Sequence, residues 1–114
     1  MAAGVRRAEI WTASGGKDYA GKPRPVAIVQ DDRFDTDSIT ICPFTTDPTD
    51  APLLRLAIEP SPDNGLREPC RLMVDKITTM PRSKLGERTG VLAVLDMVRL
   101  ERAIVVFLGL GSAS

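Results

Sequence analysis

An arginine held between two prolines is the first feature of this sequence that could do chemistry. It lies in the stretch Gly21-Lys22-Pro23-Arg24-Pro25, which leads directly into an apolar run at residues 26–29. Each proline fixes its own φ, and Pro25 pushes Arg24 out of the helical region. The result is a guanidinium on a stiff stalk that can present two parallel donors to phosphate oxygens. An ordinary solvated arginine at the start of a strand fits the same pattern.

The absence of histidine restricts the chemistry further. It excludes a Ser-His-Asp triad, a ribonuclease mechanism based on paired histidines, and most zinc enzymes. Acid–base chemistry would fall to carboxylates, lysine, arginine, tyrosine, cysteine or the substrate itself. Cys42 and Cys70 lack the spacing of metal ligands. We therefore expect both to be reduced and buried, and we expect no metal or cofactor.

The charges cancel overall but are unevenly distributed along the chain. The formal net charge is zero, from 15 basic and 15 acidic residues. The whole protein is therefore no general attractant for nucleic acid. A basic segment with Arg6, Arg7, Lys17, Lys22 and Arg24 precedes an acidic block with Asp31, Asp32, Asp35 and Asp37. Both a local basic cleft and a merely mixed surface fit this distribution.

Short strands fill most of the chain. Apolar and β-branched patterns predict strands over residues 8–13, 26–31, 38–45, 54–59 and 71–75, then a helical turn at 81–85 and a short last strand at 90–92. In the first strand, alternation places Glu9 and Trp11 opposite Ile10, although for Trp11 a core position is favoured over stacking on an unpaired base. Pro43 cannot donate to a ladder, so an edge or a bulge is expected there.

The only convincing long helix runs from about residue 94 to residue 108. Met97, Leu100, Ile104 and Phe107 follow the spacing of one buried face. A second apolar stripe consists of Val94, Val98 and Val105. The two stripes together present more apolar surface than one small sheet can cover. Either a partner chain covers the remainder or the helix is deeply buried.

Many short strands with one C-terminal helix indicate a mainly β protein, folded as a small, partly open barrel. We expect a single domain over residues 1–114. Neither a membrane-spanning stretch nor the apolar centre of a secretory signal is found in this sequence. The expected location is the cytoplasm.

Three stretches of the chain are informative when taken together. They are Gly21-Lys-Pro-Arg-Pro-Val-Ala-Ile-Val-Gln30, Ile41-Cys-Pro-Phe-Thr-Thr-Asp47, and Asp75-Lys-Ile-Thr-Thr-Met-Pro-Arg-Ser-Lys-Leu-Gly-Glu-Arg-Thr-Gly90. In these stretches the chain resembles the MazF/PemK family of type II toxin–antitoxin ribonucleases. The order and spacing of the stretches make the match specific, and it covers nearly all of the chain. The resemblance implies the SH3-like barrel of the CcdB/PemK toxin type.

The resemblance also implies site residues. The family's arginine falls on Arg24 and its strand-end threonine on Thr45, with Thr46 as the neighbour if the alignment slips by one. The family's loop glutamate has no direct match, and Asp18 is its shifted equivalent if the role is retained. Tyr19 is a further candidate for positioning the substrate or accepting a proton. Two lysines, Lys17 and Lys22, are the candidates for RNA binding.

The activity implied by the resemblance is cleavage of single-stranded RNA without a metal, by attack of the ribose 2′-hydroxyl. The implied partners are a cognate antitoxin and a second copy of the chain in a homodimer. The alternative is a CcdB-like inhibitor of DNA gyrase that performs no chemistry, although such an inhibitor needs no phosphate-binding arginine. We expect the loops at 14–22 and 47–53 to read the RNA sequence.

Overall fold

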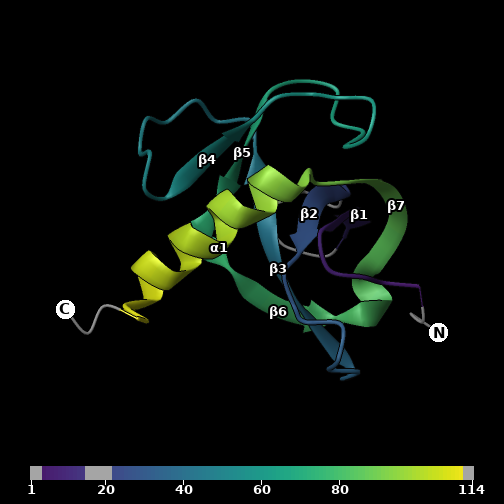
Figure 1. The fold of residues 1–114 in the computed structure, drawn as a ribbon. Coiled ribbons are helices and arrows are strands. Elements are labelled where there is room, and N and C mark those ends of the chain that lie inside the picture. Colours follow the sequence, from purple (N-terminus) through teal and green to yellow (C-terminus); the bar gives the residue numbers. More distant parts are fainter. Residues whose placement is uncertain (1–3, 15–21, 112–114) are drawn as a thin grey trace.

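The protein is mainly β, with one helix at the end of the chain, as the sequence predicts. The computed structural model describes residues 4–14 and 22–111. Seven strands pair in antiparallel fashion in the order β4-β5-β3-β2-β1-β7, with β6 also paired to β3 (Figure 1). The elements are β1 (Glu9–Ala13), β2 (Arg24–Ile28), β3 (Ser38–Thr45), β4 (Arg55–Ile58), β5 (Cys70–Met73), η2 (Val74–Lys76), β6 (Thr78–Pro81), η3 (Arg82–Lys84), β7 (Leu85–Val91) and α1 (Val94–Leu108).

Strand β3 is the hub of the sheet because three strands pair with it. β2 runs along one of its edges, while β6 and then β5 share the other edge. The ladder with β6 ends at Ile41 and the ladder with β5 begins at Phe44. Pro43 lies in the interval between these two ladders, so its missing N–H breaks neither of them. On this side of β3, Pro43 has no paired strand beside it within the described residues, as expected for a strand edge, although β2 pairs with it on the other side.

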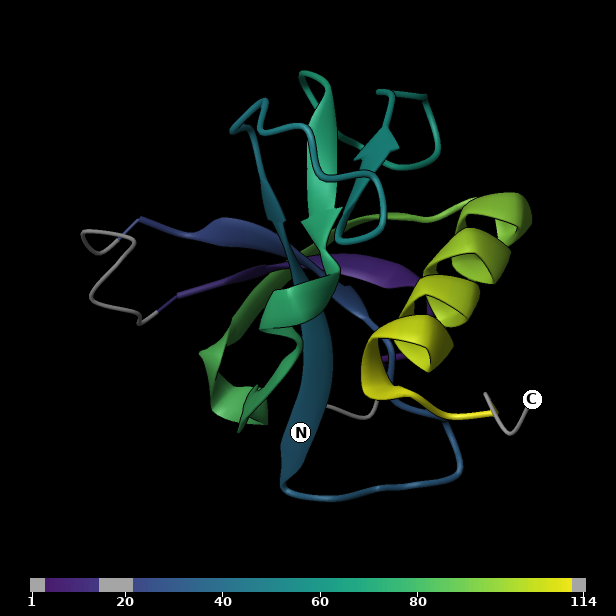
Figure 2. The same ribbon diagram turned by 90° about the vertical axis from the view of Figure 1, so that its left-hand side faces the viewer.

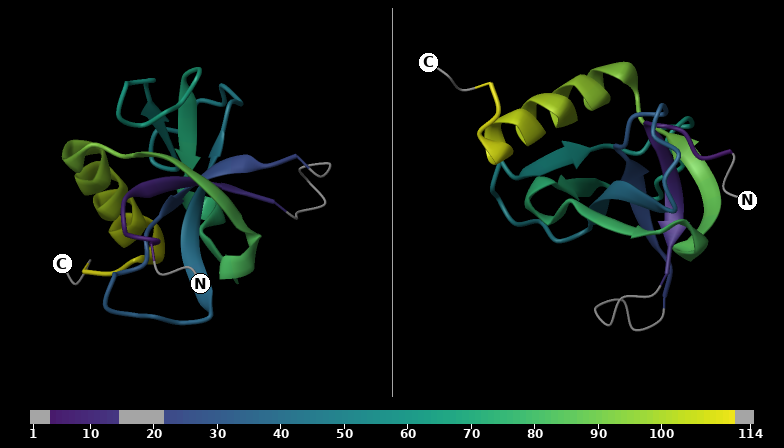
Figure 3. Two further views of the ribbon diagram at one scale, coloured as in Figure 1. Left: turned by 90° about the vertical axis from the view of Figure 1, so that its right-hand side faces the viewer. Right: turned by 90° about the horizontal axis from the view of Figure 1, so that it is seen from below.

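Two apolar clusters lie on the two faces of the strands. The larger one includes Ile10, Leu72 and Val74 and receives Leu100 from α1, all fully buried. Figure 2 and Figure 3 show α1 running along one side of the strands. A smaller cluster gathers Ala13, Val26, Ile28, Ile39 and Ile41, with Trp11 packed against it. Trp11 is half-buried rather than fully inside, and its ring borders a pocket.

The helix has the predicted bounds but a narrower buried face. Leu100 is fully buried and Met97 nearly so, while Ile104 packs partly against the core. Phe107 was predicted to be buried and is 43% exposed, because it borders an open pocket between the end of the helix and residues 51–54. Gly109 adopts φ 72°, the left-handed conformation that commonly ends a helix.

Several exposed apolar side chains extend the helix face toward solvent. They are Val94, Leu95, Val105, Val106, Phe107, Leu108 and Leu110. The surplus apolar surface predicted for this helix is therefore present in the isolated chain. Within the described residues, no helix is long and apolar enough to cross a membrane.

Several strands differ from the sequence prediction in their bounds, and the second, predicted over residues 26–31, is β2 at Arg24–Ile28. The last strand was predicted over residues 90–92 and instead is β7, seven residues long, because its solvent-exposed middle gives no apolar alternation. The predicted strand at 71–75 ends at Met73, and η2 follows at once.

Glu9 lies on the same face of β1 as Trp11, as the alternation predicts, and it is only 9% exposed. Its carboxylate accepts hydrogen bonds from the Arg6 backbone N–H at 2.8 Å and from Trp11 Nε1 at 3.1 Å. Its other oxygen pairs with Arg88 at 2.9 Å. Burial is tolerated because every acceptor has a donor.

The loop between β4 and β5 is fastened onto β7. The backbone N–H of Val91 donates to the Asp63 carbonyl at 2.9 Å. A Cβ at Gly90 would lie 2.4 Å from the carbonyl carbon of Asn64 and 2.6 Å from the Asp63 oxygen. The loop and the strand can approach this closely only because residue 90 has no side chain.

We expect Gly90→Ala to lower the free energy of unfolding by about 1–3 kcal/mol, because an added methyl group forces two backbones apart. Gly4→Ala is the matched control, since nothing lies within 4 Å of its Cβ position. Urea unfolding followed by circular dichroism measures both. Equal midpoints for the two variants would contradict the close packing of loop and strand.

Candidate functional site

Arg24 stands at the point where β2 leaves the surface and enters the core. Its side chain is exposed, while Val26, Ala27 and Ile28 behind it are almost completely buried. On the neighbouring strand β1, Ala13 pairs with Arg24. The guanidinium is therefore attached to a backbone that is fixed by proline, by a ladder and by core packing. This is the stiff stalk expected from the sequence.

The antiparallel ladder of β2 and β3 runs toward Arg24, the first residue of β2, and Thr45, the last residue of β3. Paired residues in this ladder have numbers that add to 69, as in Val26 with Pro43 and Ile28 with Ile41. Extending the same antiparallel register by two residues sets Arg24 opposite Thr45, where β3 ends. Opposite residues of adjacent strands project from the same face of a sheet. The paired part of the ladder itself ends at Val26 and Pro43, two residues before Arg24 and Thr45.

Thr45 is half-buried and its hydroxyl is held in place. Its Oγ1 accepts a hydrogen bond from the Asp47 backbone N–H at 3.1 Å. Asp47 is in turn fixed by Thr49, whose N–H and hydroxyl both donate to Asp47 Oδ1, and these bonds lower the pKa of the Asp47 carboxyl. Because Oγ1 of Thr45 is an acceptor in this turn, the hydroxyl proton remains available for a ligand.

A cleft of about 530 Å³ opens beside Arg24. It is lined from β1, from the start of β2, from Thr46 just after β3, from the loop before β5 and the first residue of β5, and from β7. Lys22, Arg24 and Thr46 therefore share one cleft, while Thr45 is not among its lining residues. The lining residues are Thr12, Lys22, Pro23, Arg24, Pro25, Thr46, Gly65, Leu66, Arg67, Glu68, Cys70 and Thr89.

Three other predicted site residues, Lys17, Asp18 and Tyr19, lie outside the described residues. The cleft also contains residues that the sequence analysis missed, namely the segment from Gly65 to Glu68. The loop at 47–53, which was expected to read RNA, contributes no residue to this cleft. The only sequence signal for the missed segment is Pro60-Ser-Pro-Asp-Asn-Gly65 before it, whose residue types are typical of a turn but do not indicate what the turn packs against.

The two cysteines are free and buried, as predicted. Burial raises the pKa of the Cys42 thiol to about 12, and the nearby Asp75 carboxylate acts in the same direction. Burial also raises the pKa of the Cys70 thiol, although this residue borders the cleft. Both thiols are protonated at neutral pH, so neither is an activated nucleophile. Within the described residues no three His, Cys, Asp or Glu side chains are grouped as metal ligands.

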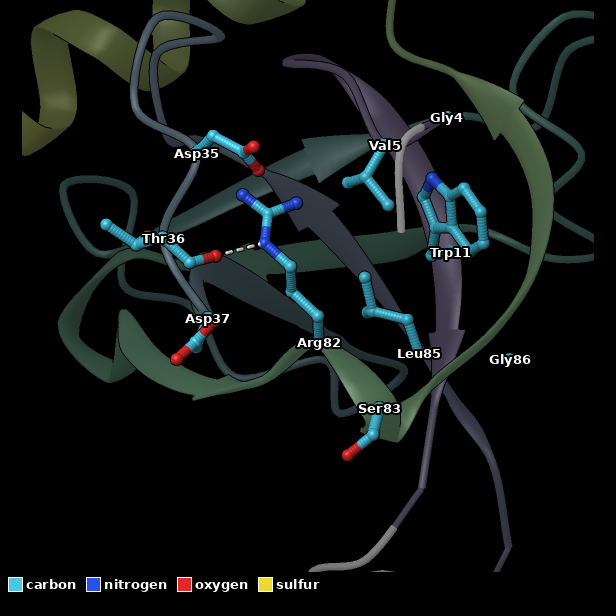
Figure 4. A pocket seen from close by; sticks show the side chains of 10 residues that line it. All are labelled: Gly4, Val5, Trp11, Asp35, Thr36, Asp37, Arg82, Ser83, Leu85 and Gly86. Atoms are coloured by element: carbon cyan, nitrogen blue, oxygen red, sulfur yellow. Dashed lines mark hydrogen bonds between the residues drawn. The ribbon is translucent and has the colours of Figure 1, made fainter. Parts of the chain in front are cut away.

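A second pocket, of about 610 Å³, lies around Trp11 and Arg82. Figure 4 shows Arg82 extended between the loop of Asp35 and Thr36 on one side and Val5 and Leu85 on the other. The Arg82 Nε donates to the Thr36 carbonyl at 2.5 Å, and its Nη2 donates to the Phe34 carbonyl at 3.4 Å. This arginine connects the acidic loop to η3, and of the predicted site residues that the structure describes none lines this pocket.

By its fold and its cleft, the chain is a small antiparallel β protein that presents cationic and hydroxyl side chains where several strands end. The model of the family described as "PemK-like, MazF-like toxin of type II toxin-antitoxin system" matches residues 6–108. The chain belongs to this family.

Relatives of known sequence and structure agree with this assignment. The chain is 59% identical over 107 residues to a probable endoribonuclease MazF of Mycolicibacterium smegmatis, covering 93% of this chain and 98% of that protein. Its fold is similar to that of the Mycobacterium tuberculosis toxin MazF-mt6, with a TM-score of 0.75 and 27% identity over 90% of this chain and 97% of the toxin. A MazE–MazF complex of Deinococcus radiodurans contains a similar fold, with a TM-score of 0.78 and 14% identity over 94% and 98% of the two chains.

Proposed function

We propose that this protein is the toxin of a type II toxin–antitoxin system and that it cleaves single-stranded RNA at the cleft beside Arg24. The observation that carries the proposal is the cleft that Lys22, Arg24 and Thr46 line together, one residue beyond Thr45 at the end of β3. The 59% identity to a probable endoribonuclease supports the same reaction. The comparisons favour this function over a gyrase inhibitor, since family model and relative are both MazF-like. A cytoplasmic location is part of the same proposal, and the proposed RNA substrate supports it.

The reaction is a transesterification in which the 5′-oxygen of the next nucleotide is the leaving group. The ribose 2′-oxygen forms a bond to phosphorus while the bond from phosphorus to the 5′-oxygen breaks. The 2′-hydroxyl proton leaves to a base, and a proton is delivered to the 5′-oxygen. The products are a cyclic phosphate and a free 5′-hydroxyl. The nucleophile belongs to the substrate, so the chain needs no histidine, thiolate or metal to supply one.

The protein's own contribution is positioning and charge stabilisation. Arg24 binds the non-bridging phosphate oxygens with two parallel donors, and this interaction strengthens as charge develops on them. Arginine holds its proton too tightly to act as a general base. Its role is therefore to bind the transition state and to donate a hydrogen bond or proton toward the leaving oxygen. The candidates for the base are Asp18, Tyr19 and a water molecule.

Thr45 supplies a neutral donor to the same phosphate. Its oxygen accepts the Asp47 N–H, so its own proton is directed away from the turn. Thr46 lines the cleft directly and is the alternative donor. Lys22, and Lys17 with it, bind the RNA backbone through charge.

Cleavage should depend on the 2′-hydroxyl and on Arg24. We expect Arg24→Ala to reduce the cleavage rate by more than 1,000-fold, about the upper limit for losing a single oxyanion-type donor, because the group lost is charged. Arg24→Lys should recover binding but little of the rate, since lysine lacks the paired donors. A 2′-deoxy substitution at the scissile nucleotide should abolish cleavage and leave binding nearly unchanged.

Gel analysis of a labelled RNA with mapped cleavage sites measures these effects, with a chelator added in parallel. The chelator should change nothing. Cleavage that survives the deoxy substitution, or that stops with the chelator, would contradict the mechanism.

The two threonines can be told apart by replacing each hydroxyl with a methyl group. We expect Thr45→Val to reduce the cleavage rate about 100-fold, as removal of a positioned donor usually does. Thr46→Val should have a much smaller effect and serves as the matched control one residue away. Single-turnover rates with saturating protein report the chemical step directly. The reverse order of effects would assign the donor to Thr46.

We also propose two protein partners, a cognate antitoxin and a second copy of this chain. Antitoxin-bound relatives include an endoribonuclease from Mycobacterial species in complex with its cognate antitoxin, whose fold matches with a TM-score of 0.76. An acidic, largely disordered antitoxin segment suits the cationic cleft and would exclude RNA from it. The exposed apolar side chains of α1 favour a self-complementary interface about a two-fold axis.

Light scattering of the purified protein at micromolar concentration tests the homodimer. We expect a mass of twice the 12.3 kDa chain. The mass of a single chain at that concentration would contradict it, irrespective of the activity toward RNA.

A further inference from the structure

The cleft has a second wall, built from the loop that joins β4 to β5. Gly65, Leu66, Arg67 and Glu68 line the cleft together with the residues around Arg24. Arg67 is an exposed cation in this wall, 43 positions away from Arg24 in the sequence. What distinguishes it from other surface arginines is the rigidity of the loop that presents it.

The side chain of Asn64 holds this loop together from inside. Asn64 is only 4% exposed. Its Oδ1 accepts hydrogen bonds from the backbone N–H groups of Ser61 and Leu66, both at 3.0 Å, and its Nδ2 donates to the Glu59 carbonyl at 2.8 Å. One buried amide therefore fixes the backbone on both sides of the turn, up to the residue before Arg67.

The same loop is packed against β7. Gly65 adopts φ 68°, and a Cβ at this position would lie 2.1 Å from the Thr89 carbonyl oxygen. Thr89 also lines the cleft. The left-handed conformation and the close contact both require glycine. The wall thus keeps its place relative to β7, which is paired with β1.

Arg67 is bracketed by two anchored neighbours. Leu66 packs partly into the main apolar cluster, and Cys70 is 7% exposed at the start of β5. Pro69 fixes its own φ between them. The backbone at Arg67 is therefore held from both directions, in the same way that prolines and a ladder hold Arg24.

We propose that Arg67 is a second phosphate-binding side chain of the cleft, one that positions the RNA strand by contacting a phosphate next to the scissile one. The proposal rests on the function proposed above. Single-stranded RNA carries a charge at every nucleotide, so a rigid cation beside the one that serves the reacting phosphate fixes the direction of the strand. Arg67 is a positioning residue, because the reacting atoms are served by Arg24.

Substitution of Arg67 should weaken the binding of RNA without slowing the chemical step. We expect Arg67→Ala to weaken RNA binding about 10-fold, in line with the loss of one charge-assisted hydrogen bond. The KM should rise while kcat stays close to its original value, because the interaction is equal in the ground and transition states. The salt dependence of log K should become shallower by about 0.7, as for one phosphate contact on a single strand.

The assay is fluorescence anisotropy with a labelled single-stranded RNA that spans a mapped cleavage site and carries 2′-deoxyribose at the scissile nucleotide, so that binding is measured without cleavage. Arg102→Ala is the matched control, since Arg102 is an exposed arginine on α1 that does not line the cleft. Arg67→Lys should retain the salt slope. Glu68→Gln should tighten binding, because it removes a negative charge from the same wall.

The proposal is overturned if Arg67→Ala matches Arg102→Ala in affinity and salt slope, or if kcat falls while KM is unchanged. Thermal unfolding of each variant shows whether it is folded, and the lysine variant provides a second test at the same site. Failure of the proposed function has a different signature, namely that the unsubstituted protein does not cleave the all-ribose form of the same RNA.

Discussion

The structure depends on the pairing of three strands with β3. Because β2, β5 and β6 all run antiparallel to it, the start of β2 and the start of β5 both lie beside its end. Val26 faces Pro43 on one edge, and Arg71 faces Thr45 on the other. The cleft forms where these strand ends converge. Its chemistry is therefore a consequence of the register of the sheet.

This arrangement gives both walls of the cleft a rigid base. One wall carries Arg24 on a strand whose next residues are core. The other wall is a loop held by Asn64 and by contact with β7. Rigid presentation matters for a reaction in which the substrate supplies the nucleophile, because the protein contributes orientation and a preorganised field. A loop that moved by an ångström would lose much of that contribution.

Local signals in the sequence were sufficient to predict the type and bounds of the elements that have a clear apolar pattern. The bounds of α1 and of β3 were predicted to the residue, since both have strong periodicity and clear ends. The stalk of Arg24 followed from two prolines and an apolar run. β7 was underestimated because its middle faces solvent and is held by pairing with β1 rather than by burial.

The remaining features depend on contacts between distant parts of the chain, which local sequence patterns cannot predict. Glu9 is buried because Arg88, far along the sequence, supplies its partner. The role of the segment from Gly65 to Glu68 depends on how closely it approaches Thr89. No periodicity encodes such an approach. The turn was visible in the sequence, but the cleft that it completes was not.

The zero net charge of the chain is compatible with RNA binding because the charges are sorted in space. Many arginines are neutralised by carboxylates: Arg7 pairs with Glu101 at 2.6 Å, Arg99 with Asp96 at 2.9 Å, and Arg55 with Asp75.

Among the described residues that line the cleft, three are basic (Lys22, Arg24 and Arg67) and one is acidic (Glu68), a local balance of +2. Exposed charges are screened over about 8–10 Å at physiological salt, so a strand in the cleft experiences this local balance rather than the total. A protein with no net charge can thus bind RNA at this cleft without attracting it to the rest of its surface. Binding is then limited to RNA strands that enter the cleft, where Arg24 lies.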